Sequence, residues 1–238
     1  MSFLALDRLA ALDETAFRQT LPYPWLSLDG LLSAQGFDRL YQDLPPLSQL
    51  KRAFNRPRRY RQMPHDRYVL EYCDDLPLAP SWRAFIEQLK SPAYHAAIAR
   101  LLGRDDFKLH CHWHYATKGC SVSPHCDARW KLGSQIFYFN REPDWQAEWG
   151  GETWVLDDRG RFPFNSAPAF NDFDAEYSAP AMGDSSLIFM RQGNSWHGVK
   201  PLTCPEGALR KVFIVEFIDA KPFVRSREFI NYLLLKLT

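Results

Sequence analysis

Short runs of strand-forming residues, separated by glycines, fill the second half of this chain and constrain its fold more than any other feature. The runs are rich in β-branched and aromatic residues and occupy 108–115, 134–140, 152–156, 185–190 and 211–217. The glycines between them are Gly119, Gly150, Gly151, Gly183 and Gly193. The first run alternates with a period of two, as a strand does. Together they predict antiparallel sheets that form a closed or sandwich-like β core.

The first third of the chain has a helical pattern instead. Ser33 is expected to begin a helix that Pro45 ends, and Ser81 to begin the next one. A third helix is expected over residues 92–102, with Gly103 as its C-terminal cap. Helices followed by antiparallel strands predict the α+β class.

No break in composition requires a second domain, so the whole chain, residues 1–238, is predicted to form one. Its expected parts are a mainly helical support at 1–105, a β core at 106–222 and a C-terminal helix at 223–238. The last helix has one apolar face, formed by Ile230, Leu233, Leu234 and Leu237. That face is expected to pack on the core, with a homodimer contact as the alternative.

Charge and composition exclude several classes of partner. The net charge is +1, so no global attraction to nucleic acid or an anionic membrane is expected. No run approaches the roughly 18 apolar residues of a membrane span, and the acidic, polar start does not resemble a secretory leader. The five cysteines are an odd number without a CxxC pair, which is typical of reduced thiols and predicts a cytoplasmic location.

Three residues have the chemistry of a metal site. His125 and Asp127 are two positions apart, so on a strand their side chains point to the same face. His197 follows the apolar run 185–190 and can approach from a facing strand. Two imidazoles and one carboxylate can occupy one face of an iron(II) ion and leave three positions open. A His-x-Asp triplet is common by chance, however, and a distant histidine alone does not decide the matter.

A wider set of motifs resembles the iron(II)- and 2-oxoglutarate-dependent dioxygenases, in particular their prolyl-hydroxylase-like branch. The resemblance covers about residues 107–218 and follows the order of the family's motifs. The matching segments are HYATKGCSVSPHCD, SQIFYFN, GGETWVL, APAMGDSSLIFMRQGNSWHGVKPL and ALRKVFIVEF.

This resemblance implies a double-stranded β-helix, or jelly roll, with helices on one side. It also implies that His125, Asp127 and His197 bind Fe(II), and that 2-oxoglutarate and O2 are consumed as cosubstrates. Arg210 matches the residue that binds the distal carboxylate of 2-oxoglutarate, and a guanidinium suits that task because it can pair with a carboxylate through two hydrogen bonds. Tyr138 and Tyr115 match tyrosines of the cosubstrate pocket.

The arginine position has a neighbouring alternative. The spacing from His197 to Arg210 is longer than in the shortest relatives, and Lys211 follows directly. Adjacent residues on a strand face opposite ways, so only one of the two enters the pocket. Arg210 is the expected one.

The implied reaction is hydroxylation of an unactivated C–H bond, with a protein side chain such as proline as the leading substrate. The alternative is a small molecule or a free amino acid. A second alternative is a metal-binding jelly roll without turnover, although such a protein has no need of Arg210. Asp127 argues against a halogenase, and Glu216 stands where nucleic-acid demethylases have a second arginine, so a nucleic-acid substrate is not expected.

Two further clusters, one basic and one of histidines, lie outside the triad. The basic stretch 51–67 could attract an acidic partner, but a solvated loop is the favoured interpretation. His110, His112 and His114 alternate along one strand face. Their spacing of about 6–7 Å is awkward for one ion, so roles on the outer face or beside the metal ligands are expected instead.

Overall fold

The computed structural model describes residues 2–221. The C-terminal helix expected at 223–238, and the homodimer contact suggested for it, lie outside the described residues. The α-helices are α1 Leu6–Ala10, α2 Glu14–Gln19, α3 Ala34–Gln42, α4 Pro80–Leu89 and α5 Pro92–Leu102. The 3-10 helices are η1 Leu47–Gln49, η2 Arg59–Arg61, η3 Ala147–Trp149 and η4 Phe170–Asp172. The strands are β1 Trp25–Asp29, β2 Lys51–Ala53, β3 Arg67–Glu71, β4 Phe107–Ala116, β5 Val122–His125, β6 Lys131–Tyr138, β7 Thr153–Asp157, β8 Ala175–Ala179, β9 Ser185–Met190, β10 Trp196–Val199 and β11 Arg210–Asp219.

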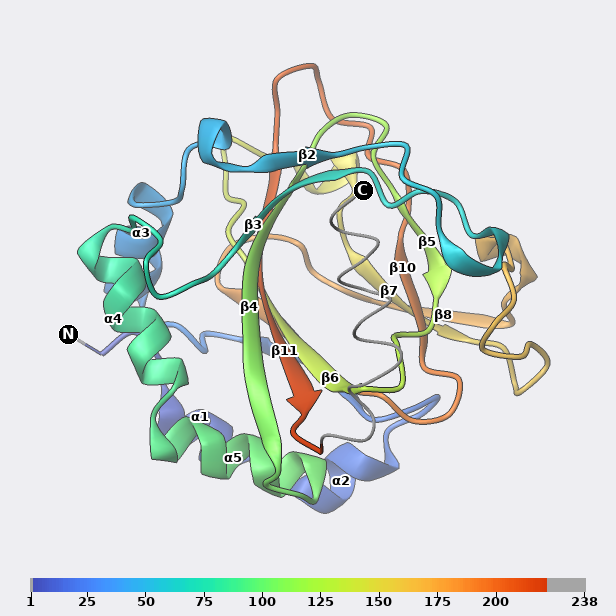
Figure 1. Ribbon diagram of the computed structural model, residues 1–238, viewed down its shortest axis with the longest axis horizontal. Coiled ribbons are helices and arrows are strands. Elements are labelled where there is room, and N and C mark those ends of the chain that lie inside the picture. The colour runs from blue at the N-terminus through green and yellow to red at the C-terminus, as the bar shows by residue number, and fades with distance from the viewer. Residues whose placement is uncertain (1, 222–238) are drawn as a thin grey trace.

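Two antiparallel sheets face each other. The larger has seven strands in the order β1-β9-β6-β11-β4-β3-β2, and the smaller has four in the order β5-β10-β7-β8. Figure 1 shows β4, β11 and β6 on one side of the molecule and β5, β10, β7 and β8 on the other. This arrangement is the α+β double-stranded β-helix that the sequence motifs implied.

Strand β11 lies at the centre of the large sheet, between β4 and β6. Its pairing with β4 runs without interruption from Arg210 opposite Ala116 to Asp219 opposite Phe107. Because successive side chains alternate between faces, Arg210 and Glu216 point towards the small sheet. Phe213 and Phe217, on the opposite face of the strand, lie in the core with the helices. One strand thus supplies both the wall of an internal cavity and the main core.

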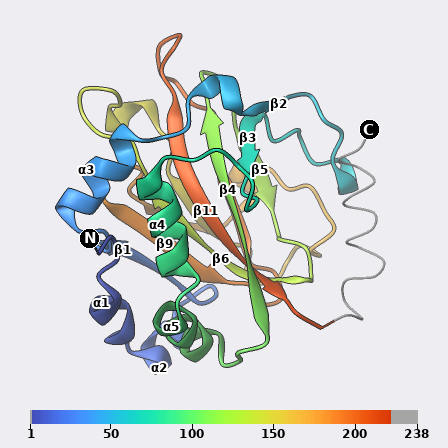
Figure 2. The ribbon, with the colours of Figure 1, turned by 60° about the vertical axis from the view of Figure 1, so that its left-hand side comes forward.

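The helices cover the outer face of the large sheet, where α3, α4 and α5 lie in Figure 2. Trp82 of α4 is fully buried there, and its ring lies 5.0 Å from the rings of both Trp113 and Phe213. The indole N–H of Trp82 donates to the carbonyl oxygen of Leu40 at 3.1 Å, so its polar atom is satisfied as well. No helix within residues 2–221 combines the length and apolar character needed to cross a membrane.

The strands expected in the second half of the chain are present as β4, β6, β7, β9 and β11. The first third differs from a mainly helical support because β1, β2 and β3 join the large sheet. The cap expected at Ser33 is confirmed, since its hydroxyl accepts from the Gly36 amide at 3.1 Å. The cap expected at Ser81 is wrong: α4 begins at Pro80, and the Ser81 hydroxyl donates to Asp43 at 2.6 Å.

Trp82→Ala is expected to lower the free energy of unfolding by about 3–5 kcal/mol, because it removes a large side chain from the layer between helices and sheet. Leu21→Ala is the control, since Leu21 is 75% exposed. That change should stay within about 0.5 kcal/mol. Urea titration followed by circular dichroism measures both, and equal effects would show that Trp82 does not anchor the helical layer.

Candidate functional site

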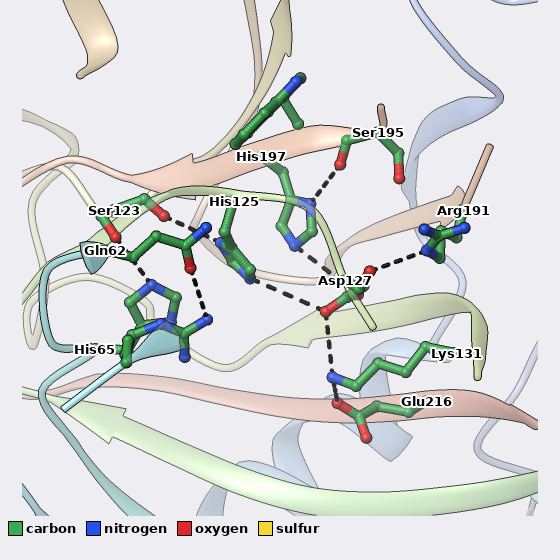
Figure 3. Close-up of polar contacts among 12 residues, drawn as sticks. Gln62, His65, Ser123, His125, Asp127, Lys131, Arg191, Ser195, His197 and Glu216 are labelled. Atoms are coloured by element: carbon green, nitrogen blue, oxygen red, sulfur yellow. Dashed lines mark hydrogen bonds and ion pairs between the residues drawn. The ribbon is translucent and has the colours of Figure 1, made fainter. Parts of the chain in front are cut away.

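His125, Asp127 and His197 meet at one point of the interior (Figure 3). His125 ends β5 and lies directly opposite His197 of β10, and Asp127 follows two residues after His125. Oδ1 of Asp127 lies 3.9 Å from Nε2 of His125, and Oδ2 of Asp127 lies 3.9 Å from Nε2 of His197. Ligand atoms that each lie about 2.1 Å from one ion can be up to about 4.2 Å apart. The three side chains are therefore placed to share one metal ion.

Hydrogen bonds set the tautomer of both histidines. Nδ1–H of His125 donates to the Ser123 carbonyl at 3.0 Å, and Nδ1–H of His197 donates to the Ser195 carbonyl at 3.1 Å. The lone pair of each Nε2 is then left to face the common centre. Burial lowers the pKa of both imidazoles, and the positive charge of Arg58 acts in the same direction. Both rings are neutral, as metal ligands must be.

The carboxylate of Asp127 is also fixed from outside the triad. The Lys131 ammonium donates to Asp127 Oδ1 at 3.2 Å and also contacts Glu216 (Figure 3). The guanidinium of Arg191 donates to the backbone carbonyl of Asp127 at 2.9 Å. Nδ1 of His110 lies 2.9 Å from the Glu216 carboxylate. These contacts hold the carboxylate in the orientation that faces the two histidines.

The triad lines a cavity of about 360 Å³ between the two sheets. Arg210 forms another part of its wall and is almost fully buried. Its Nε donates to the Gly151 carbonyl at 2.6 Å, and its Nη2 lies 3.4 Å from the Thr153 hydroxyl. The Tyr138 hydroxyl donates to the same Thr153 oxygen at 2.8 Å. A guanidinium is thus held rigidly in the wall of the cavity that contains the triad.

The backbone of Gly151 is needed for this arrangement. Its φ of +104° is rare for residues with a side chain, and a Cβ there would lie 3.2 Å from Arg210 Cδ. The glycine therefore allows both the turn and the close approach of the arginine. The segment GGETWVL, singled out in the sequence, provides this turn.

Two other residues considered for the pocket, Lys211 and Tyr115, point away from the cavity. Lys211 points away from the cavity, and its ammonium lies 3.6 Å from Asp144. This agrees with the strand register expected for Arg210. The prediction that Tyr115 lines the cosubstrate pocket is wrong. Tyr115 faces the helical side of β4, where its hydroxyl donates to the Pro45 carbonyl at 2.9 Å, because His114 occupies the cavity-facing position beside it.

The three alternating histidines of β4 were expected either on the outer face of the strand or beside the metal ligands. The first of these two interpretations is wrong. His112 and His114 line the cavity, and burial lowers the pKa of both. Among the described residues, only His110 and His112 of the three group with a carboxylate, that of Glu216, at distances short enough for a metal. Lys131 already contacts Glu216, so an ammonium occupies the place of a second cation.

A segment of the basic stretch, residues 57–67, covers the cavity and is called here the roof segment. The ring of His65 packs edge-on against that of His125, with centroids 4.5 Å apart, and Nε2 of His65 lies 3.2 Å from the Ser123 hydroxyl. The amide of Gln62 donates to the Ser166 carbonyl at 3.1 Å. The roof segment is thereby joined to the long 158–183 connection.

Sequence reasoning missed most of these roof residues. Arg58, Arg59 and Arg67 line the cavity, whereas Arg56 of the same stretch is exposed and lies outside the lining. The interpretation as a solvated loop is therefore wrong for part of the stretch. Position in the sequence was the available signal: the stretch leads into β3, and β3 pairs with β4, whose His112 and His114 line the cavity.

Neither family models nor curated proteins give a match to this chain. Several solved structures match the chain. A prolyl-4-hydroxylase of Pseudomonas putida matches with a TM-score of 0.57 and 16% identity, over 86% of this chain and 97% of that one. A Trichoplax adhaerens prolyl hydroxylase in complex with a hypoxia inducible factor peptide matches with a TM-score of 0.59 and 15% identity, over 90% of both chains. The epimerase SnoN, in complex with Fe3+, alpha ketoglutarate and nogalamycin RO, matches with a TM-score of 0.56 and 16% identity, over 91% and 84%.

At such identities the likeness is one of fold. The chain has the prolyl-hydroxylase-like fold of the 2-oxoglutarate oxygenases, with a His-Asp-His group between its two sheets.

Proposed function

We propose that this protein is an Fe(II)- and 2-oxoglutarate-dependent dioxygenase that hydroxylates an unactivated C–H bond. The observation that supports it most is the convergence of His125, Asp127 and His197 in a cavity that also holds the buried guanidinium of Arg210. A metal site alone would suit many proteins. A metal site beside a carboxylate-binding group suits an enzyme whose cosubstrate is a dicarboxylic acid.

The donor set fits iron(II). Two neutral imidazoles and one carboxylate on one side of an ion are the usual ligands of non-haem iron oxygenases, and they leave positions for other ligands. With iron(II) bound there, O2 would be the oxidant: one of its oxygen atoms would enter the succinate formed as 2-oxoglutarate loses carbon dioxide, and the other would form the new hydroxyl group. Lys131 and Arg191 act on the triad indirectly, as positioning residues that keep Asp127 turned towards the histidines.

Arg210 is suited to the distal carboxylate of 2-oxoglutarate. Burial lowers its pKa, which reflects the cost of a desolvated cation. Its hydrogen bonds among residues 2–221 are to the Gly151 carbonyl and the Thr153 hydroxyl. No carboxylate of these residues forms an ion pair with it, and Glu152 acts on it only at longer range. A buried cation without a direct anionic partner is costly. A dicarboxylate in the cavity would remove that cost, which also argues against a metal-binding protein without turnover.

A protein side chain, such as that of proline, is the first candidate for the hydroxylated group. Two structural neighbours support it, since they are prolyl hydroxylases and one is in complex with a peptide. A small molecule or free amino acid is the second candidate. The roof segment favours it, because residues of this segment line the cavity and Gln62 ties it to the Ser166 carbonyl, which leaves less room for a continuous polypeptide. The neighbour in complex with nogalamycin RO is described with a small molecule.

Asp127→Ala is expected to abolish succinate formation from 2-oxoglutarate with Fe(II), because it removes the only carboxylate of the triad. Asp38→Ala is the control, since that carboxylate is exposed and lies outside the cavity. Succinate is quantified by mass spectrometry, and circular dichroism checks that both variants fold. Full activity in the folded Asp127 variant would remove this residue from the ligand set.

Arg210→Ala is expected to weaken 2-oxoglutarate binding by about 1.5–3 kcal/mol, the scale of hydrogen bonds to a charged group. Lys211→Ala should leave binding unchanged, because its side chain points out of the cavity. Anaerobic calorimetry of the Fe(II)-loaded protein measures both affinities. A loss caused by Lys211→Ala instead would place the cosubstrate on the other face of β11.

Gly151→Ala is expected to weaken 2-oxoglutarate binding indirectly, because the new Cβ would displace the side chain of Arg210. Gly119→Ala is a matched control: Gly119 also has a positive φ, of +77°, but nothing lies within 4 Å of an added Cβ. Both variants should lose stability through backbone strain of about 1 kcal/mol. Equal 2-oxoglutarate affinities in the two variants would contradict the role assigned to Gly151.

A further inference from the structure

The cavity has more positive charge than the proposed reaction requires. The described residues that line it include six cationic side chains and three carboxylates, those of Glu71, Asp127 and Glu216. The cations are Arg58, Arg59, Arg67, Arg129, Lys131 and Arg210. Iron(II) and the two carboxylates of 2-oxoglutarate would cancel each other in charge. The excess therefore remains when both are bound.

Much of this excess lies in the roof segment, next to the metal ligands. Arg58 is largely shielded from solvent, and burial together with the charge of Arg67 lowers its pKa to about 10. The Nη2 of Arg58 donates to Gln62 at 3.4 Å, a long hydrogen bond. Its Nε is buried and has no hydrogen-bond partner among residues 2–221. The Arg58 guanidinium is therefore still able to bind an anion.

The position of Arg58 relates this charge to the substrate rather than to 2-oxoglutarate. Arg210 extends from β11 between Gly151 and Thr153, whereas Arg58 belongs to the roof segment above the triad. Gln62, which Arg58 contacts, joins this segment to Ser166. Arg58 lines the same cavity as the triad, and its charge acts on the imidazoles of both His125 and His197. A molecule placed at the metal ligands therefore lies within the field of Arg58.

We propose that the primary substrate is an acid whose carboxylate binds Arg58, with Arg67 adding to the positive field. This inference rests on the proposed function and names the chemical class of its substrate. A guanidinium pairs with a carboxylate through two parallel hydrogen bonds, which fixes orientation as well as affinity. The ion pair would hold the substrate so that a nearby C–H bond faces the metal. The carboxylate can belong to a free amino acid or to an acidic residue of a peptide.

Binding of matched acid and amide pairs tests this inference. The protein is loaded with Fe(II) and saturating 2-oxoglutarate without oxygen, and each probe is titrated by calorimetry. L-Proline against L-prolinamide represents the free acid, and acetyl-Glu-Pro-Glu-amide against acetyl-Gln-Pro-Gln-amide represents the peptide. At least one acid should bind about tenfold or more tightly than its amide, as expected for a hydrogen-bonded ion pair. The pair that shows the difference identifies the source of the carboxylate.

Substitutions test whether the preference for the acid over the amide depends on the roof segment. Arg58→Gln should reduce the acid-to-amide ratio to about one, whereas Arg56→Gln should retain it, since Arg56 lies in the same stretch but outside the lining. The inference is wrong if no acid binds better than its amide in the unaltered protein, or if the preference survives Arg58→Gln. Titration of 2-oxoglutarate alone precedes these measurements. Its failure to bind would overturn the proposed function, whereas normal binding without an acid preference would overturn this inference alone.

Discussion

The antiparallel pairing of β11 with β4 and β6 is the constraint on which the rest of the structure depends. It places Arg210 in the cavity and Lys211 outside it, and it directs Phe213 towards the helices. A shift by one residue would exchange the two faces of the strand. The carboxylate-binding group would then leave the cavity and the core would lose its aromatic residues. Packing against Trp82 therefore fixes the position of Arg210 as much as any contact within the cavity.

The strand pattern could be predicted from the sequence because it depends on local spacing, whereas the complete triad was expected only from the family resemblance, since His197 lies far from His125 and Asp127 in the sequence. A His-x-Asp pair at the end of a strand projects to one side, and apolar runs bounded by glycine form strands wherever the chain places them. The expectation for Tyr115 came from the motif match, which does not determine the face of β4 on which a residue lies. His114 lines the cavity, so its neighbour Tyr115 faces the helices. The three alternating histidines were expected on the outer face or beside the metal ligands, and His112 and His114 line the cavity.

The roof segment could not be predicted in the same way. Its contact with the 158–183 connection joins Gln62 to Ser166, which are 104 positions apart. A sequence shows that residues 51–67 are basic, but not which of them a distant loop will shield from water. Whether an arginine is shielded from water decides its role. Solvent screens the charge of an exposed arginine, whereas the charge of a shielded arginine acts more strongly on a nearby ligand. Arg56 and Arg58 are two positions apart and differ in this respect.

The two arginines of the cavity also differ in how strongly they should hold a carboxylate. Among residues 2–221, Arg210 is 6% exposed and donates two hydrogen bonds, whereas Arg58 is less buried and donates one, which is long. Charge interactions are stronger and less screened in the interior than near the surface. On the proposed mechanism, Arg210 would retain 2-oxoglutarate while Arg58 allows a substrate acid to exchange. The order in which two acids bind would then follow from the depth at which each guanidinium is buried.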